Sequence, residues 1–295
     1  MNASPNSRPL FTTHSFRSAG HNLVYDVYGS GARTVVYTHG LLLNSDLNRG
    51  IAGALAARGN RVILLDLLGH GRSDQPPHAS EYRIDSYAEQ VVALLDELGL
   101  EQAVLGGLSL GANVSLFAAA RHPDRVSGLV LEMPVLEWAV PSAALAFIPL
   151  LLAAHYGRGA LVPLSALFRR VPRTRFDALN TILHAASLPP SVMASILHGV
   201  LVGPVAPTAD ERAAITAPTL VLAHSNDLIH PFDDAVNLAH QMPNARLVRA
   251  RSPLELRLFP ERLTADIANF VESIELGARR GRRRGQSVSG VDAAE

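Results

Sequence analysis

The sequence predicts an α/β fold, with a mostly parallel sheet, helices on both faces and a helical cap inserted after the sixth strand. Three observations predict it. Short apolar runs without clean alternation recur along the chain, as expected for strands that are covered on both faces. Segments with helical periodicity separate most of these runs. One long interval, from Pro134 to Ala213, breaks the alternation and is too long for an ordinary connection.

The expected elements follow one another in chain order. Two alternating runs, Phe11–Phe16 and Leu23–Tyr28, predict an antiparallel strand pair joined through residues 19–22. The six further predicted strands are Thr34–Thr38, Arg61–Asp66, Ala103–Gly107, Ser127–Glu132, Thr219–Ala223 and Ala245–Arg249. The helices predicted outside the long interval are Arg49–Ala57, Ser86–Leu98, Gly111–His122, Asp233–Gln241 and Arg262–Leu276. We therefore expect one core domain, built from residues 1–133 and 214–276.

The long interval, residues 134–213, is predicted to form the helical cap. Its helical stretches are expected to be broken by prolines, namely Pro141, Pro149, Pro163, Pro172, Pro189 and Pro190. Its most apolar part, residues 139–154, is too short to span a bilayer comfortably. Large apolar side chains predict a hydrophobic pocket wall, the alternative being that they pack the cap onto the core: Trp138, Phe147, Leu151, Phe168 and Phe176.

Composition excludes several kinds of chemistry. The 295 residues carry equal numbers of acidic and basic side chains, which argues against nucleic acid as the main partner. The chain has no cysteine, which excludes thiol catalysis, and no lysine, which excludes Schiff-base chemistry. We expect no metal, no organic cofactor, no signal peptide and no membrane span, and a cytoplasmic location. The Arg-rich end, residues 277–295, is expected to be a disordered tail.

A serine between two glycines, in Gly107-Leu108-Ser109-Leu110-Gly111, stands between an apolar run and a helical run. This order predicts a strand, a sharp turn and a helix, with the serine at the turn. Such an elbow strains the serine backbone and lifts its hydroxyl clear of the sheet. Glycines are needed there because a side chain would collide with the neighbouring strand and helix. A serine that only caps the helix gives the same pentapeptide, so the context has to decide.

Three more segments follow predicted strands, where catalytic groups gather in open α/β sheets. In the loop after the first parallel strand, the N–H of Leu41 could join that of Leu110 in a two-donor oxyanion hole. His39 in this loop and the turn Asp66–Asp74 are interpreted as structural. In the loop after the seventh strand, Asp227 could orient a histidine and hold its tautomer, the alternative being an ordinary loop residue.

Together these segments resemble the α/β-hydrolase superfamily over most of the chain. The matching pieces, in family order, are His39-Gly40, Asp66 with Gly69-His70-Gly71-Arg72-Ser73, the serine elbow, and Asp227 before His230-Pro231. The resemblance implies that Ser109 is the nucleophile, that Asp227 is the triad acid, and that the N–H groups of Leu41 and Leu110 form the oxyanion hole. Glu132 is an alternative acid. A serine rather than an aspartate at the elbow disfavours epoxide hydrolases and haloalkane dehalogenases.

The chain departs from this family pattern at the catalytic histidine. The family carries it in the loop after the eighth strand, which here reads Ala250-Arg251-Ser252-Pro253-Leu254-Glu255. Pro253 stands at or near the expected position, and no histidine follows His240. Because serine is a poor nucleophile without a base, the identity of the base becomes the central question.

Three alternatives are open. Another histidine could be the base, and the candidates are His224, His230, His184 and His198. Of these His224 is the more attractive, because it directly follows a strand. Water, the substrate or a carboxylate such as Glu255 could instead assist Ser109. Finally, the scaffold could bind an apolar ligand without turning it over.

We expect a hydrolase that acts on a small apolar ester, lactone or related carbonyl compound through Ser109, with a non-standard base. The alternatives are a catalytically impaired protein that binds an apolar ligand, and lyase-like chemistry on the same fold. The sequence leaves the substrate and the oligomeric state open.

Overall fold

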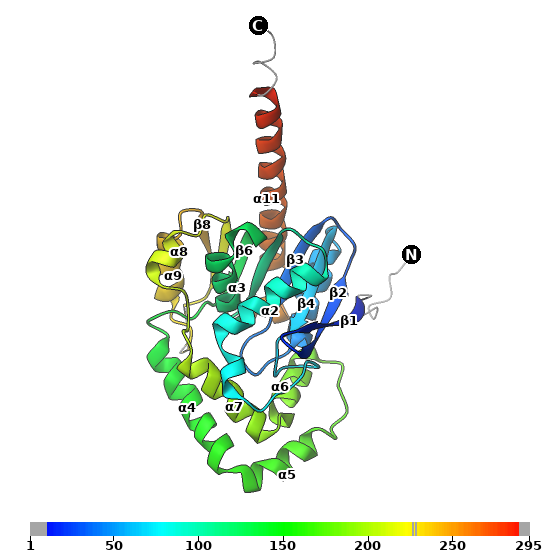
Figure 1. Cartoon of the computed structure of the whole chain (residues 1–295), viewed down its shortest axis with the longest axis vertical. Coiled ribbons are helices and arrows are strands. Elements are labelled where there is room, and N and C mark those ends of the chain that lie inside the picture. The colour runs from blue at the N-terminus through cyan, green and yellow to red at the C-terminus, as the bar shows by residue number, and fades with distance from the viewer. Residues whose placement is uncertain (1–10, 226, 228, 289–295) are drawn as a thin grey trace.

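A computed structural model describes residues 11–225, 227 and 229–288, with side chains as far as Ile274. Its centre is an eight-stranded sheet in the order β1-β2-β4-β3-β5-β6-β7-β8 (Figure 1). β1 pairs antiparallel with β2 and β2 with β4, whereas all later neighbours are parallel. The mostly parallel sheet predicted from sequence is confirmed. The strands are β1 (Phe11–Ser18), β2 (His21–Tyr28), β3 (Arg33–Thr38), β4 (Asn60–Asp66), β5 (Ala103–Leu108), β6 (Val126–Glu132), β7 (Thr219–Ala223) and β8 (Ala245–Arg249).

Helices cover both faces of the sheet. One face packs against α2 (Ile84–Glu97), α3 (Leu110–Arg121) and α9 (Phe232–Gln241), the other against α1 (Arg49–Ala56), α10 (Glu255–Leu258) and α11 (Glu261–Val288). Three short 3₁₀ turns complete this part: Ser45–Asn48, Ala79–Tyr82 and Pro123–Arg125.

Successive side chains of one strand pack into the two hydrophobic cores on opposite faces of the sheet. In β4, Ile63 and Leu65 pack toward α2 and α3, whereas Val62 and Leu64 pack toward α1 and α11. All four side chains are fully buried. Because both faces are covered, each strand can be continuously apolar, and this is the pattern by which the strands were predicted.

Between β6 and β7 the chain forms helices α4 (Val140–Tyr156), α5 (Arg158–Phe168), α6 (Asp177–Ser187), α7 (Pro190–Val202) and α8 (Ala209–Ala213). We call residues 134–213 the helical insert. Figure 1 shows α4 to α7 beyond one end of the strands. The expectation that prolines break these helices is wrong at Pro149 and Pro163, which lie inside α4 and α5. Both prolines are exposed, so water can solvate the carbonyl group that each leaves without a donor.

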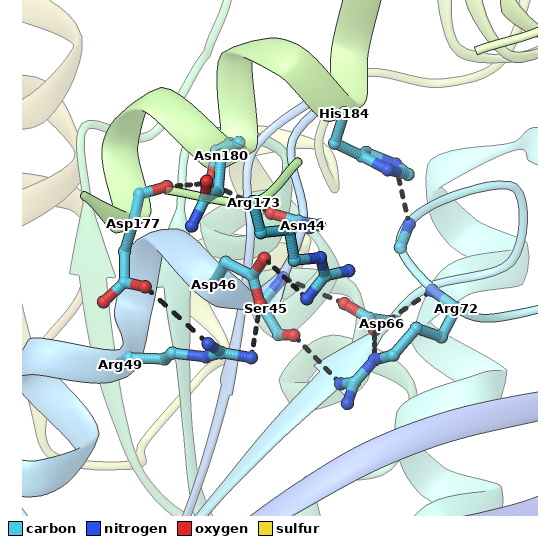
Figure 2. Close-up of polar contacts among 12 residues, drawn as sticks. Asn44, Ser45, Asp46, Arg49, Asp66, Arg72, Arg173, Asp177, Asn180 and His184 are labelled. Carbon is cyan, nitrogen blue, oxygen red and sulfur yellow. Dashed lines mark hydrogen bonds and ion pairs between the residues drawn. The ribbon is translucent and has the colours of Figure 1, made fainter. Parts of the chain in front are cut away.

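Buried and partly buried hydrogen bonds connect α6 of the insert to loops of the core (Figure 2). Thr181 Oγ1 donates to Asn44 Oδ1 at 2.9 Å, and the backbone N–H of Gly71 donates to His184 Nε2 at 3.0 Å. Burial lowers the pKa of His184, which keeps its ring neutral and able to accept this bond. His184, one of the candidate bases, is therefore engaged in structure.

Charged side chains pair at the same junction. Figure 2 shows Arg49 of α1 between two carboxylates, with its nitrogens 2.7 Å from Asp46 Oδ1 and 3.7 Å from Asp177 Oδ1. Arg173, in the insert, lies 3.5 Å from Asp46 Oδ2. Asp46 is almost fully buried, so these pairs satisfy a carboxylate that would otherwise be costly to bury.

The C-terminal segment differs from the sequence prediction. The expected disordered tail from residue 277 is wrong as far as Val288, because α11 continues to that residue. Arginine, which occurs five times in residues 277–288, is a good helix former, and the helix continues through the three glycines of this segment. Figure 1 shows this end of α11 projecting away from the sheet. The rest of the predicted tail, residues 289–295, and the polar start, residues 1–10, lie outside the described residues.

Candidate active site

The turn from β5 to α3 places Ser109 in a strained conformation, with φ of 53° and ψ of −108°. A positive φ is uncommon for a residue other than glycine and persists only where surrounding contacts enforce it. Here the Ser109 N–H donates to the carbonyl oxygen of Glu132 at 2.8 Å, which ties the turn to the end of β6. This is the strand, turn and helix arrangement that the sequence predicted.

The two flanking glycines are required by close backbone contacts. A Cβ atom on Gly107 would lie 2.6 Å from the carbonyl carbon of Gly111 and from Thr38 Oγ1. A Cβ atom on Gly111 would lie 2.5 Å from Thr38 Oγ1 and 2.6 Å from the Thr38 carbonyl oxygen. The elbow therefore packs directly on the end of β3, which brings the loop containing Leu41 beside it.

His230 and Asp227, from the loop after β7, complete a hydrogen-bonded chain with the serine. The Oγ atom of Ser109 and Nε2 of His230 are 2.9 Å apart, and Nδ1 of His230 lies 2.9 Å from Asp227 Oδ2. A carboxylate only accepts, so Nδ1 carries the ring proton and Nε2 is left to accept from the serine hydroxyl. This is the geometry of a nucleophile, a base and an orienting acid.

The structure places His230, and not His224, against the serine. His224 Nε2 lies 3.2 Å from Asp227 Oδ2, on the far side of the acid. The expectation that His224 is the more attractive base is therefore corrected. A residue that directly follows a strand stays beside the sheet, and His224 is buried there. His230 lies farther along the loop, where the chain turns toward the elbow.

Asp227 is held as an anion. Burial alone opposes its ionisation, but the hydrogen bond and electrostatic interaction with the His230 ring, and the N–H groups of Ile229 and His230, keep the pKa of this carboxyl well below its usual range. Those N–H groups donate to Asp227 Oδ1 at 2.8 and 3.1 Å. Both oxygens of the carboxylate are thus occupied, which fixes the direction in which it points.

The other candidate groups are engaged elsewhere. Glu132 accepts from Tyr37 Oη at 2.7 Å and from the two terminal nitrogens of Arg257 at 3.0 and 2.9 Å. Glu255 is bound by Arg262 at 2.8 and 2.9 Å. His198, on α7, is exposed. Pro253 lines one cavity together with Ser109 and His230, so the loop after β8 does reach the site, but without a histidine.

Two cavities meet at Ser109. The first, of about 160 Å³, is lined almost entirely by apolar side chains of the insert and the core, and Leu41 and Leu110 belong to its wall. Leu110 is the first residue of α3, where a backbone N–H has no partner within the helix. The second cavity, of about 320 Å³, contains His230.

The predicted apolar wall is only partly correct. Phe147 of α4 lines both cavities. Trp138 and Phe176 are instead 66% and 57% exposed, on the outside of the insert. Composition predicted an apolar insert but did not predict which aromatic side chains face the cavities and which face solvent. Among the described residues, His, Asp and Glu side chains form no cluster that could hold a metal ion.

Comparison with known proteins agrees with this fold. Residues 33–161 match the model of the alpha/beta hydrolase fold family. The putative carbamate hydrolase RutD of Caulobacter sp. (strain K31) is 30% identical over 241 residues, which are 76% of this chain and 85% of that protein. The AB hydrolase superfamily protein YisY of Bacillus subtilis (strain 168) is 29% identical over 249 residues, 80% of this chain and 89% of that protein. The chain belongs to the α/β-hydrolase fold family.

Solved structures show the same architecture. The enol-lactonase from Burkholderia xenovorans LB400 superposes with a TM-score of 0.69 at 21% identity, covering 88% of this chain and 100% of that one. Est816, an N-acyl homoserine lactone degrading enzyme, gives a TM-score of 0.68 at 25% identity, covering 87% and 100%. These two structures show that the fold is shared, and the family match and RutD support hydrolase activity in general.

Proposed function

We propose that the protein is a serine hydrolase that cleaves a small apolar ester or lactone, with Ser109 as nucleophile, His230 as general base and Asp227 as the orienting acid. The observation that carries this proposal is the continuous chain of 2.9 Å contacts from Ser109 through His230 to Asp227. Its base comes from the loop after β7, whereas the family pattern has it after β8.

The geometry suggests the order of proton transfers. His230 takes the proton of Ser109 as the hydroxyl attacks the substrate carbonyl, and Asp227 stabilises the imidazolium that results. The N–H groups of Leu41 and Leu110 are proposed to bind the oxyanion, assisted by the N-terminus of α3. His230 then returns the proton to the leaving alcohol, and water attacks the acyl-enzyme with His230 again as base.

The cavities support an apolar carbonyl substrate. In the smaller one, the side chain of Asn113 is already bonded to Val135 and Val205, so apolar groups dominate what a ligand would meet. His230 lines only the larger cavity, so we place the leaving group there and the acyl group in the smaller one. Relatives named as an enol-lactonase and a lactone-degrading enzyme support the ester and lactone class.

A fluorophosphonate probe tests the proposal, followed by kinetics on short acyl esters. We expect labelling of the wild type and none of Ser109→Ala. His230→Ala should lower kcat by about 10⁴- to 10⁶-fold. His240→Ala, an exposed histidine on α9, is the matched control and should keep wild-type rates. A wild type that binds apolar ligands but neither labels nor turns over ester would instead identify a binding protein, and unchanged rates in His230→Ala would exclude this base.

A further inference from the structure

The outer side of the helical insert exposes large apolar side chains. On α4, Leu145 and Tyr156 are each 79% exposed. Exposed apolar side chains continue over α5 and α6, and include Val162, Leu167, Phe176 and Ile182. Figure 1 shows α4 and α5 on the side of the molecule away from the sheet. Soluble monomers rarely expose so many large apolar groups in one region, which indicates that a partner covers them.

The charged side chains from the start of α4 to the residue before α6 have one sign. Between Trp138 and Phe176 the sequence has arginines at positions 158, 169, 170, 173 and 175 and no aspartate or glutamate. All of these arginines are exposed. The whole chain has 26 basic and 26 acidic residues, so this excess is local. An apolar protein partner would not require this local positive charge. An anionic lipid surface complements both the apolar and the basic side chains.

We propose that the outer side of α4 to α6 docks on an anionic lipid bilayer and lies in its interface. Together, α4 with α5 and α6 with α7 have the length and hydropathy of a membrane segment, but they are bent by 99° and 98° where they join. We place them along the surface because the opposite sides of α4 and α7 line the cavity at Ser109. The apolar side chains enter the headgroup region and the arginines meet the lipid phosphates.

This orientation brings the bilayer close to the catalytic cavity. Phe147 and Ile148 of α4 line the cavity that contains Ser109, and Ile148 is also 45% exposed. An amphiphilic ester could therefore pass from the bilayer beside α4 to the serine. That delivery step rests on the proposed function, whereas the docking does not.

Vesicle co-sedimentation of the full chain tests the docking. Ser109→Ala is used as the background, so that lipid is not consumed. We expect binding to vesicles of phosphatidylcholine with phosphatidylglycerol, weaker binding to phosphatidylcholine alone, and release by salt. Leu145→Ser with Tyr156→Ser should lower the bound fraction several-fold. Arg158→Gln with Arg170→Gln should remove the preference for the anionic lipid.

Matched controls change the same residue types elsewhere. Leu258→Ser removes a 59% exposed side chain of α10, and Arg17→Gln with Arg58→Gln removes two exposed charges of the core. Neither should alter binding. Light scattering of the Leu145→Ser, Tyr156→Ser variant serves as a further check, because conversion of a dimer to a monomer would show that a second copy covers this side and would overturn the proposal.

The two proposals fail separately. A protein whose Ser109 labels but that does not bind anionic vesicles overturns the docking and leaves the proposed hydrolase. Vesicle binding by a protein that does not label overturns the hydrolase and leaves the docking. Binding that is insensitive to both sets of insert variants also overturns the docking.

Discussion

At the scale of single residues, Asp227 lies between two histidines. His230 and His224 both approach Asp227 Oδ2, at 2.9 and 3.2 Å, and only His230 also reaches Ser109. His224 is buried, so its contact with the acid is shielded from water. We therefore expect His224 to position the acid.

His224→Ala should therefore reduce activity far less than His230→Ala does. Loss of one hydrogen bond to a charged group costs about 1.5–3 kcal/mol, which corresponds to roughly a 10- to 100-fold fall in kcat. KM for a short ester should change little, since His224 does not line either cavity at Ser109. Kinetics of the two variants on one ester measure this, and equal losses in both would contradict the assignment.

The glycine after the nucleophile gives a second prediction at this scale. In Gly111→Ala, the added Cβ atom would meet Thr38 backbone and side chain at 2.5–2.8 Å. We expect the free energy of unfolding to fall by about 1–3 kcal/mol, together with loss of labelling at Ser109.

Gly50→Ala is the matched control for this substitution. Gly50 is an exposed residue of α1, and nothing lies within 4 Å of its added Cβ atom. Its better helix propensity should raise stability by up to about 1 kcal/mol. Chemical denaturation of both variants measures these changes. An unchanged free energy of unfolding in Gly111→Ala would show that the elbow can relax around the added Cβ atom.

At the scale of elements, the order of strands explains where the base can come from. β7 is two places from β5 in the sheet and β8 is three, so the loop after β7 begins nearer the elbow. The loop after β8 still reaches the site, where α10 contributes Arg257 to the cavity wall. Arg257 binds Glu132, which is the residue whose carbonyl oxygen fixes Ser109.

Arg257→Ala should be strongly destabilising, because it leaves the buried Glu132 carboxylate without its charge partner. Breaking such a pair from one side costs about 3–5 kcal/mol. Both side chains are almost fully buried, with 8% and 6% exposure. Thermal or chemical unfolding measures the loss, and the double variant Arg257→Met, Glu132→Gln should recover much of it. A single variant as stable as the wild type would contradict this account.

At the scale of the whole molecule, the buried His39 and His70 and the partly buried His184 are neutral in the folded protein. Burial lowers the pKa of His39, His70 and His184. Each accepts a backbone N–H at Nε2, from Leu67, Leu42 and Gly71 respectively. His39 and His70 thus hold the loops around the site, in agreement with the structural role expected for both.

This predicts sensitivity to acid. In the unfolded chain these histidines titrate near pH 6.5, so as the pH falls below that value the unfolded state binds protons first. The free energy of unfolding should be level above about pH 7 and should then decrease, each histidine contributing up to about 1.4 kcal/mol per pH unit. Asp66 and Asp227, whose pKa values are lowered, add to the loss only below about pH 4.

Denaturation midpoints measured across this pH range check the prediction. His184→Gln should make the slope shallower, because the glutamine oxygen can accept the Gly71 N–H without titrating. His240→Gln, an exposed control, should leave the slope unchanged. Stability that stays constant from pH 7 to 5 would contradict the assignment of neutral buried histidines.

The sequence by itself determined the sheet, the helices around it and the elbow at Ser109. Periodicity reports which faces of an element are buried, and glycine reports where a backbone must come close, so local patterns carried these features. Periodicity did not report that α4 and α5 continue through Pro149 and Pro163, which depends on solvent reaching a carbonyl group. Nor did it show that Trp138 and Phe176 face outward.

The tertiary structure alone decided which histidine meets the serine. Ser109 and His230 are 121 positions apart, and their contact depends on the order of β5, β6 and β7 and on the path of one loop. The sequence named both His224 and His230 beside Asp227 and favoured His224, whereas the structure places His230 against the serine. Side-chain direction in a loop is set by contacts with distant segments, and a one-dimensional pattern does not encode those contacts.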